Sequence, residues 1–280
     1  MNIKSIKYII KQLMVSPLPI RLHLPILLMR KFKLGGFRLR LSLDALPYPP
    51  YAYGMLNAAI QAKELGLKRI SAIEFGVAGG NGMLAMQDLA KEIENETGVV
   101  FELFGFDTSS GLPTSSDYRD QLYFWSSGGF PMDLVTLRAK LNRSELIIGD
   151  VAETTTNFFK NYSPPPIGFI AFDLDYYSST KSAFNIFNNT YDFFMPRVEC
   201  YMDDVGSYEI LSANSGTGVL RAIHEFNNES DTKIYKKEQV SHYRHLPHAW
   251  NEKMYVHHIF NHQQYSTDVS KSYKMGMGLD

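Results

Sequence analysis

Two segments about 20 residues apart, at residues 170–180 and 199–204, each contain a short apolar run that ends in a pair of acidic residues. The first run ends in Asp173 and Asp175, and the second run ends in Asp203 and Asp204. Apolar runs of this length are typical of buried parallel strands, and ligands of open α/β sheets bind at the carboxyl ends of such strands. The pattern therefore predicts that four carboxylates meet at one edge of a parallel sheet.

Four neighbouring carboxylates repel one another unless a cation holds them together. Oxygen ligands alone favour a hard divalent ion, either Mg²⁺ or Ca²⁺. The alternative is that one or two of these acids cap the helices that follow their strands.

The rest of the chain alternates short apolar runs with helical patterns. We expect strands at residues 69–75, 101–106, 145–148, 167–172, 198–202, 232–236 and 254–260. We expect helices at residues 53–65, 82–94, 133–141, 151–161, 179–194 and 218–228. Alternation of this kind is typical of an α/β fold with a doubly wound, mostly parallel sheet and an antiparallel edge strand. The 280 residues suffice for one such domain with an appendage, and the single cysteine, Cys200, is expected in its core.

The appendage is a basic N-terminal arm, which we assign to residues 1–50, with the domain at 51–280. Residues 1–43 hold nine Lys or Arg and no acid, whereas the rest holds 19 basic and 29 acidic residues, a net charge of −10. Pro17, Pro19 and Pro25 are expected to break the arm into short pieces. Such an arm can bind an anionic membrane surface or cover an acidic neighbour in a homo-oligomer.

Charge and hydropathy also bear on location and partners. The uncharged apolar pieces of the arm are short and contain proline, so neither can span a bilayer, and no secretory cleavage site follows the basic start. We therefore expect a cytoplasmic protein, with peripheral contact at the inner membrane face as the alternative. An acidic body argues against a nucleic-acid partner.

A glycine-rich loop follows the first expected strand, with glycines at 76, 79, 80 and 82. Glycines there let the backbone approach a ligand at a helix N-terminus. The spacing departs from the dinucleotide fingerprint, and no phosphate-binding lysine follows. Glu74 would repel a pyrophosphate and would suit an amino group. The alternative is that these glycines serve the geometry of the turn alone.

Acids also follow the next two expected strands. Asp107 is placed to accept hydrogen bonds from a ribose diol, and Asp150 to accept one from an adenine amino group, although each could instead be a helix cap. Together with Glu74 they predict a nucleoside pocket for a cationic ligand without phosphate. S-adenosylmethionine has these properties.

Three motifs carry a resemblance to a known family: Glu74-Phe-Gly-Val-Ala-Gly-Gly80, Phe106-Asp-Thr-Ser-Ser-Gly-Leu-Pro113 and Phe172-Asp-Leu-Asp-Tyr-Tyr-Ser-Ser-Thr180. They resemble the S-adenosylmethionine-dependent O-methyltransferases of the macrocin type, which methylate sugar hydroxyls of macrolide and aminocoumarin natural products. The resemblance covers about residues 53–205. The arm and residues 113–142 depart from it; we expect residues 113–142 to form a lid or acceptor-binding insertion.

The resemblance implies a Rossmann-like methyltransferase sheet, S-adenosylmethionine as the cofactor, and Mg²⁺ or another divalent cation. It implies that the cofactor is bound by Glu74, Gly76, Gly79, Asp107, Ser109, Asp150 and Asp173. It also implies that Asp173, Asp203 and Asp204 are the metal ligands and that Asp175 is the general base. A rival base is one of the histidines of the C-terminal part, which are His242, His245, His248, His257, His258 and His262.

The leading hypothesis is thus an enzyme that moves a methyl group from S-adenosylmethionine to a hydroxyl, of a sugar in a glycan or natural product. One alternative is a small non-sugar acceptor, such as a catechol, which uses the same metal chemistry. Another is a membrane-associated, non-catalytic binding protein on the same fold. The four clustered acids weigh against a protein that has lost its chemistry.

Overall fold

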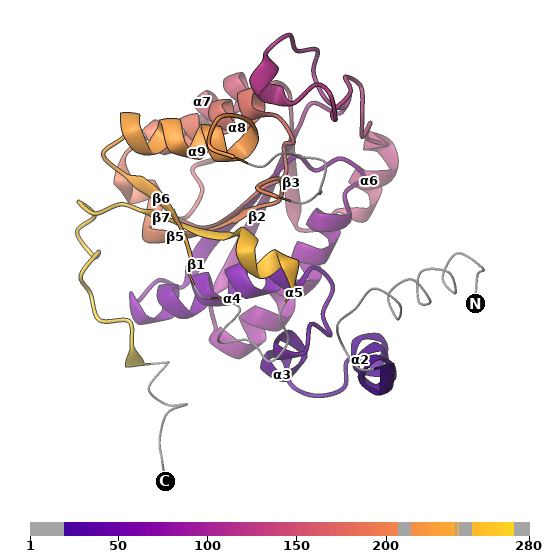
Figure 1. Ribbon diagram of the computed structural model, residues 1–280. Helices are drawn as coiled ribbons and strands as arrows, with labels where there is room; N and C mark the ends of the chain where they lie inside the picture. Colours follow the sequence, from indigo (N-terminus) through magenta and orange to yellow (C-terminus); the bar gives the residue numbers. More distant parts are fainter. Residues whose placement is uncertain (1–19, 207–213, 239, 241–247, 272–280) are drawn as a thin grey trace.

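The computed structural model describes residues 20–206, 214–238, 240 and 248–271. Its seven strands form one sheet in the order β3-β2-β1-β4-β5-β7-β6 (Figure 1). Strands β1 to β5 pair in parallel, and β7 runs antiparallel to both β5 and β6. This confirms the predicted α/β fold with a doubly wound, mostly parallel sheet. The reversed strand, β7, lies between β5 and the outermost strand β6.

The strands are β1 (Arg69–Phe75), β2 (Val100–Asp107), β3 (Ser144–Ile148), β4 (Ile167–Phe172), β5 (Phe194–Met202), β6 (Lys233–Lys236) and β7 (Met254–His258). The α-helices are α2 (Ile20–Phe32), α3 (Phe37–Ser42), α4 (Pro49–Glu64), α5 (Asn81–Thr97), α6 (Leu134–Lys140), α7 (Val151–Tyr162), α8 (Tyr177–Ala183) and α9 (Gly218–Glu229). Short 3₁₀ helices are η1 (Tyr118–Asp120), η2 (Phe184–Asn188), η3 (Tyr191–Phe193) and η5 (Ala249–Lys253).

Helices cover both faces of the sheet (Figure 1). On one face α4 and α5 bury residues such as Met55 and Leu89 against the strands. On the other face α7, α8 and α9 do the same with residues such as Phe158 and Ile223. Because both faces are covered, the central strand β4 is apolar and buried along its whole length.

Four strands end at the same level of the sheet. Phe75 is in register with Phe106 on one side and with Phe172 on the other, and Phe172 is in register with Met202. The next residue in each strand is therefore Gly76, Asp107, Asp173 or Asp203. The register of the parallel strands thus brings three carboxylates and one glycine to one edge.

The helix expected at residues 179–194 is wrong. Helix α8 ends at Ala183, two 3₁₀ helices follow, and β5 begins at Phe194. Apolar residues spaced like those of a helix instead fill the space between α8 and the sheet, where Phe184 and Phe187 are buried. Pro196, expected to end that helix, lies inside β5. It is tolerated there because the pairing of β4 with β5 is irregular between Phe194 and Glu199.

Pro17 and Pro19 lie outside the described residues, and from residue 20 onward the arm is more regular than Pro25 predicts. Helix α2 continues through Pro25, so the expected break at that residue is wrong. The helix expected from residue 53, α4, starts at Pro49 instead, because proline suits the first turn of a helix. Phe37, Leu41 and Leu46 are buried in the same core cluster as α4. Within the described part of the chain, every helix is too short or too polar to cross a membrane.

Candidate active site

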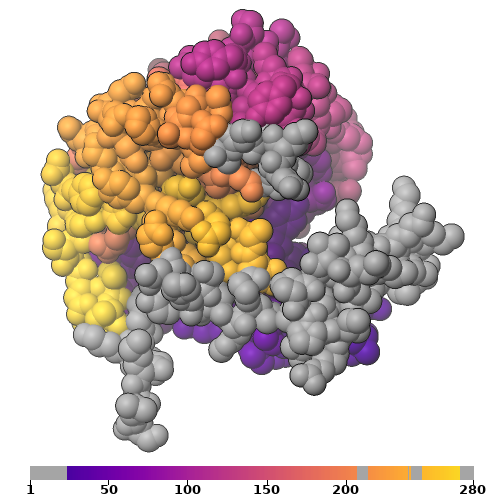
Figure 2. All heavy atoms as spheres, viewed as in Figure 1, coloured from indigo at the N-terminus to yellow at the C-terminus, as the bar shows by residue number. Residues whose placement is uncertain are grey.

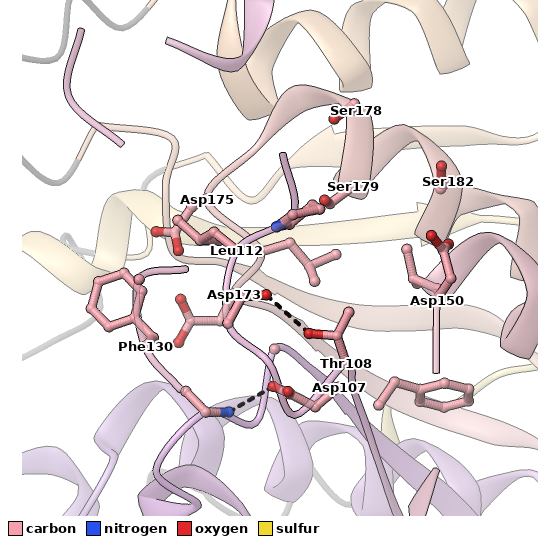
Figure 3. A pocket seen from close by; sticks show the side chains of 18 of the residues that line it. Asp107, Thr108, Leu112, Phe130, Asp150, Asp173, Asp175, Ser178, Ser179 and Ser182 are labelled. Carbon is pink, nitrogen blue, oxygen red and sulfur yellow. Dashed lines mark hydrogen bonds between the residues drawn. The ribbon is translucent and has the colours of Figure 1, made fainter. Parts of the chain in front are cut away.

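A cavity of about 500 Å³ opens at the carboxyl ends of the parallel strands (Figure 3). Its wall carries six carboxylates, those of Asp107, Asp150, Asp173, Asp175, Asp203 and Asp204. None of the described residues in this wall is Lys or Arg. The cavity therefore attracts cations and disfavours phosphates.

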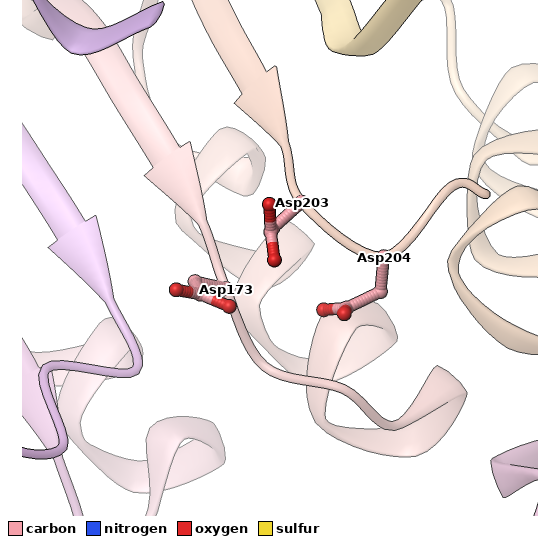
Figure 4. A group of neighbouring side chains, drawn as sticks. All are labelled: Asp173, Asp203 and Asp204. Carbon is pink, nitrogen blue, oxygen red and sulfur yellow. The ribbon is translucent and has the colours of Figure 1, made fainter. Parts of the chain in front are cut away.

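Asp173, Asp203 and Asp204 form an acid cluster at the ends of the neighbouring strands β4 and β5 (Figure 4). One potential ligand atom from each of the three lies within 4.8 Å of those of the other two. Burial, and then the neighbouring acids, raise the pKa of Asp173 and of Asp204 well above the usual value. An oxygen-only group this crowded fits a hard divalent cation, which would stabilise the charged carboxylates.

Donors from the protein orient two members of this acid cluster. The Tyr201 hydroxyl and the Lys253 ammonium both donate to Asp203 Oδ1, at 2.5 Å and 2.9 Å. The backbone N–H of Asp175 donates to Asp204 Oδ2 at 3.0 Å. Lys253 was missed by the sequence analysis because it lies 50 residues beyond Asp203, in η5, and belongs to no motif. Such outer partners orient the ligands of a metal site.

Asp175 borders the acid cluster without belonging to it, and its side chain lines the same cavity. Its backbone is left-handed, with a φ of 59°, and the Tyr176 N–H donates to the Leu174 carbonyl at 2.6 Å to close a tight turn around it. A non-glycine residue in this conformation is strained, and such strain gathers at functional sites. Burial, and then the charge of Asp203, raise the pKa of Asp175 to about 7.

Asp107 is the last residue of β2, and Asp150 directly precedes α7. Asp107 accepts hydrogen bonds from the backbone N–H groups of Ala78 (2.8 Å) and Ser109 (2.6 Å), which fix its carboxylate at the wall. Asp150 accepts one from the N–H of Ala152 at 2.8 Å and caps α7. The helix-cap alternative for Asp150 therefore holds, and because Asp150 also lines the cavity, its contact with an adenine stays a prediction.

The glycine loop contributes to the site in part. Gly76 lines the cavity, and a Cβ there would lie 1.7 Å from the Asp173 carbonyl oxygen, so the two strand ends require glycine. Glu74 lies behind the loop, buried, where the Tyr51 hydroxyl donates to it at 2.7 Å and burial raises its pKa to about 8. Three residues that were expected to bind the cofactor do not line the cavity wall: Glu74, Gly79 and Ser109.

The insertion at residues 113–142 supplies another wall, through Pro113, Trp125, Gly129 and Phe130. Asp120, fully buried, ties this insertion to α8: it accepts hydrogen bonds from the backbone N–H (2.7 Å) and the hydroxyl (2.8 Å) of Ser178. Helix α8 in turn lines the cavity with Ser178, Ser179 and Ser182 (Figure 3). Asp120 thus holds the insertion against the helix that follows the acidic turn.

The histidines proposed as a rival base do not reach this cavity where the structure describes them. His242 and His245 lie outside the described residues. His257 is buried beside Thr232, and burial lowers its pKa to about 3. His258 pairs with the Tyr265 hydroxyl. His248 lies 3.1 Å from the Asp44 carboxylate. His262 lies beside the N-terminus of β5, at the opposite end of that strand from the cavity.

The chain matches no protein-family model and no curated protein. It is similar to three solved structures of methyltransferases. The calicheamicin methyltransferase CalS11 is 23% identical, with 71% of this chain and 76% of that chain covered and a TM-score of 0.41. The O-methyltransferase NovP is 15% identical, with 65% and 75% covered and a TM-score of 0.41. The mycinamycin methyltransferase MycE is 13% identical, with 70% and 46% covered and a TM-score of 0.35. The functional argument therefore rests on the cavity itself.

Proposed function

We propose that this protein is a metal-dependent O-methyltransferase that moves a methyl group from S-adenosylmethionine to a hydroxyl of a sugar, in a glycan or a natural product. The observation that carries the proposal is a wall with six carboxylates and, among the described residues, no Lys or Arg. Crowded carboxylates need cationic ligands. A sulfonium cofactor and a divalent metal ion supply positive charge without phosphate.

The two ends of the cavity suit different ligands, the cofactor at one end and the metal ion at the other. Asp107 and Asp150 lie toward one end and suit the ribose and adenine of the cofactor, while Asp173 and Asp175 lie toward the other (Figure 3). A pyrophosphate would meet the same carboxylates without a compensating cation, which disfavours a dinucleotide. This division allows cofactor binding and metal binding to be lost separately.

The acid cluster, Asp173, Asp203 and Asp204, would hold the metal ion. When bound, the ion supplies Lewis acidity that makes a nearby hydroxyl easier to deprotonate. Asp175 lines the cavity beside the acid cluster and is placed to accept the hydroxyl proton. Tyr201 and Lys253 orient Asp203, so that the carboxylates keep their places while ligands enter and leave.

The insertion is the best candidate for acceptor recognition. Trp125 and Phe130 present aromatic rings at the wall, and Ser178, Ser179 and Ser182 present hydroxyls. Rings and hydroxyls together suit the apolar faces and the hydroxyl groups of a sugar. The same rings favour, as a second candidate, a catechol-like acceptor that stacks on them.

Calorimetry with S-adenosylmethionine, with and without Mg²⁺, tests the cofactor. We expect binding that Asp107→Ala weakens by about ten- to a hundred-fold, because a bidentate contact with the ribose is lost. Asp88→Ala, which removes an exposed acid on α5, is the matched control and should bind as the wild type does. Binding of NADH without binding of S-adenosylmethionine would overturn the proposal.

Transfer of a labelled methyl group tests the reaction and the acceptor. Free sugars and glycosides that carry no nucleotide phosphate should be methylated, and catechols should not. Asp175→Asn should lower transfer by roughly 10²–10⁴-fold, the usual contribution of a general base, with Mg²⁺ affinity unchanged. Transfer that persists in excess chelator would remove the metal from the mechanism, and methylated catechols with inert sugars would favour the second candidate.

A further inference from the structure

Helix α2 presents an apolar stripe to solvent. Leu24, Leu28 and Phe32 are spaced four residues apart, so they share one face of the helix, and they are 64%, 40% and 58% exposed. Leu34 and Leu39, just beyond the helix, are also exposed, each at 52%. Large apolar side chains gathered in this way on a surface mark an interaction site.

The charged residues of α2 and of the chain up to residue 43 are all basic. Arg30 and Lys31, in the last turn of α2, are exposed. Lys33, Arg38 and Arg40 pair with Glu92 and Glu96 of α5, which neutralises the acids of the body that lie closest to the arm. The preceding sequence adds further basic residues and no acid. Helix α2 and the sequence on either side of it therefore carry a net positive charge.

We propose that α2 binds an anionic lipid surface. The helix lies in the plane of the headgroups, its stripe of Leu24, Leu28 and Phe32 enters the acyl boundary, and Lys31, whose ammonium lies over the Phe32 ring, contacts an acidic headgroup. Its 13 residues span about 20 Å, too short for the ~30 Å hydrocarbon core, so it lies on the membrane rather than across it.

Two observations favour lipid over a second copy of the chain. A stable dimer buries roughly 800 Å² on each partner, far more than three side chains of one short helix provide. The body, with a net charge of −10 beyond residue 43, is repelled by an anionic membrane, so the basic arm supplies both the attraction and the orientation. Helix α2 lies toward the bottom of Figure 1, whereas the insertion, in magenta, is exposed at the top of the molecule in Figure 2, so binding through α2 leaves the insertion accessible.

The test is co-sedimentation of the full chain with vesicles of phosphatidylcholine alone and with vesicles in which phosphatidylglycerol replaces part of it. We expect binding to the anionic vesicles only, weakened by high salt. Combined Leu24→Gln, Leu28→Gln and Phe32→Gln should reduce it at least ten-fold, as should combined Arg30→Gln and Lys31→Gln. The matched control is Val135→Gln with Arg138→Gln on α6, an exposed apolar and basic pair that should leave vesicle binding unchanged.

Cofactor binding by each variant shows that it is folded. Equal binding to both kinds of vesicle, or full binding by the triple variant, would overturn the proposal. A third outcome would also overturn it: the wild type does not bind vesicles and has the mass of a dimer in light scattering, whereas the triple variant is monomeric. Helix α2 would then bind a second copy of the chain.

Discussion

The carboxylate of Glu225 and the carboxylates of the acid cluster lie in opposite electrostatic surroundings. Glu225 of α9 contacts Lys181, Arg221 and Arg119, and the Tyr177 hydroxyl donates to it at 2.5 Å. Hydrogen bonds from Lys181 first, and then from Tyr177, lower its pKa to about 2. In the acid cluster, where the Lys253 ammonium contacts Asp203, burial and the neighbouring acids instead raise the pKa of Asp173 and of Asp204.

On the proposed function, the difference separates a structural acid from a functional one. Around Glu225 the chain supplies its own cations, and the carboxylate stays charged. At the cavity the proposed metal ion would supply positive charge from outside, and holding these carboxylates together without it costs the protein stability. The contrast predicts opposite responses to mutation, to pH and to metal.

The largest expected effect is the loss of metal binding in Asp204→Asn. At a concentration a hundred times the dissociation constant, Mg²⁺ should raise the free energy of unfolding of the wild type by about 2.7 kcal/mol, and should raise that of the variant by almost nothing. Without divalent ions the variant should be slightly more stable than the wild type, because a charge repelled by Asp175 and Asp203 is gone. Urea denaturation with and without Mg²⁺ measures both.

Glu225→Gln is the matched control for that experiment, since it should keep the full stabilisation by Mg²⁺. An Asp204→Asn protein that gains as much from Mg²⁺ as the wild type does would show that the cation is held elsewhere.

The second effect concerns Glu225 and has the opposite sign. Glu225→Gln should lower the free energy of unfolding at neutral pH by about 2–3 kcal/mol, because several charge-assisted hydrogen bonds are weakened. The folded-state pKa of Glu225 is depressed to about 2. Its contribution is therefore complete above the unfolded value near 4.5 and is lost as the pH falls toward 2.

Urea denaturation from neutral pH down to pH ~3 should show the two proteins converging. The exposed neighbour Glu229 is the control, and Glu229→Gln should change stability by less than about 0.5 kcal/mol. A gap that widens on acidification would contradict this account.

The sequence predicted the sheet well because buried parallel strands are short apolar runs whose ends are marked by glycine or aspartate. It failed at residues 179–194, where the spacing of Phe184 and Phe187 imitates a helix, since 3₁₀ turns and the irregular start of β5 have no local signal. It failed at Pro25 as well, because a single proline removes one backbone hydrogen bond from a helix without always ending the helix.

For the site, the sequence located those carboxylates that directly follow strands, because the shared level of the strand ends follows from the parallel register. Lys253 and Asp120 were missed, since each reaches the site from a segment distant along the chain. Glu74 was placed in the pocket on the strength of its motif. The side chain of Glu74 instead turns toward Tyr51 and Gly82, behind the loop.

Glu74 extends the comparison to another buried acid, which belongs neither to the acid cluster nor to an ion pair among the described residues. A Cβ at Gly82 would lie 1.8 Å from Glu74 Oε1. Gly82→Ala should therefore destabilise the protein by about 1–3 kcal/mol, the usual cost of overpacking. Gly79→Ala, where no atom lies within 4 Å of the added carbon, is the control.

Combining Gly82→Ala with Glu74→Ala should cancel most of the cost in a double-mutant cycle of unfolding free energies, because the clashing carboxylate is gone. Equal costs of Gly82→Ala in both backgrounds would show that Glu74 is not what requires glycine at this position.

The smallest expected effect is that of Lys253→Met, which removes a cation that contacts the acid cluster. The Lys253 ammonium donates to Asp203 and repels an incoming cation. Its removal should raise the affinity for Mg²⁺ by about three- to ten-fold, in line with roughly 1 kcal/mol for two charges a few ångströms apart in water. Calorimetric titration with Mg²⁺ measures the change, and Lys236→Met, which removes a cation paired with the exposed Glu252, should leave the affinity unaltered. A lower affinity in Lys253→Met would mean that holding Asp203 in place matters more than the repulsion. The acid cluster would then depend, as Glu225 does, on a cation of the chain.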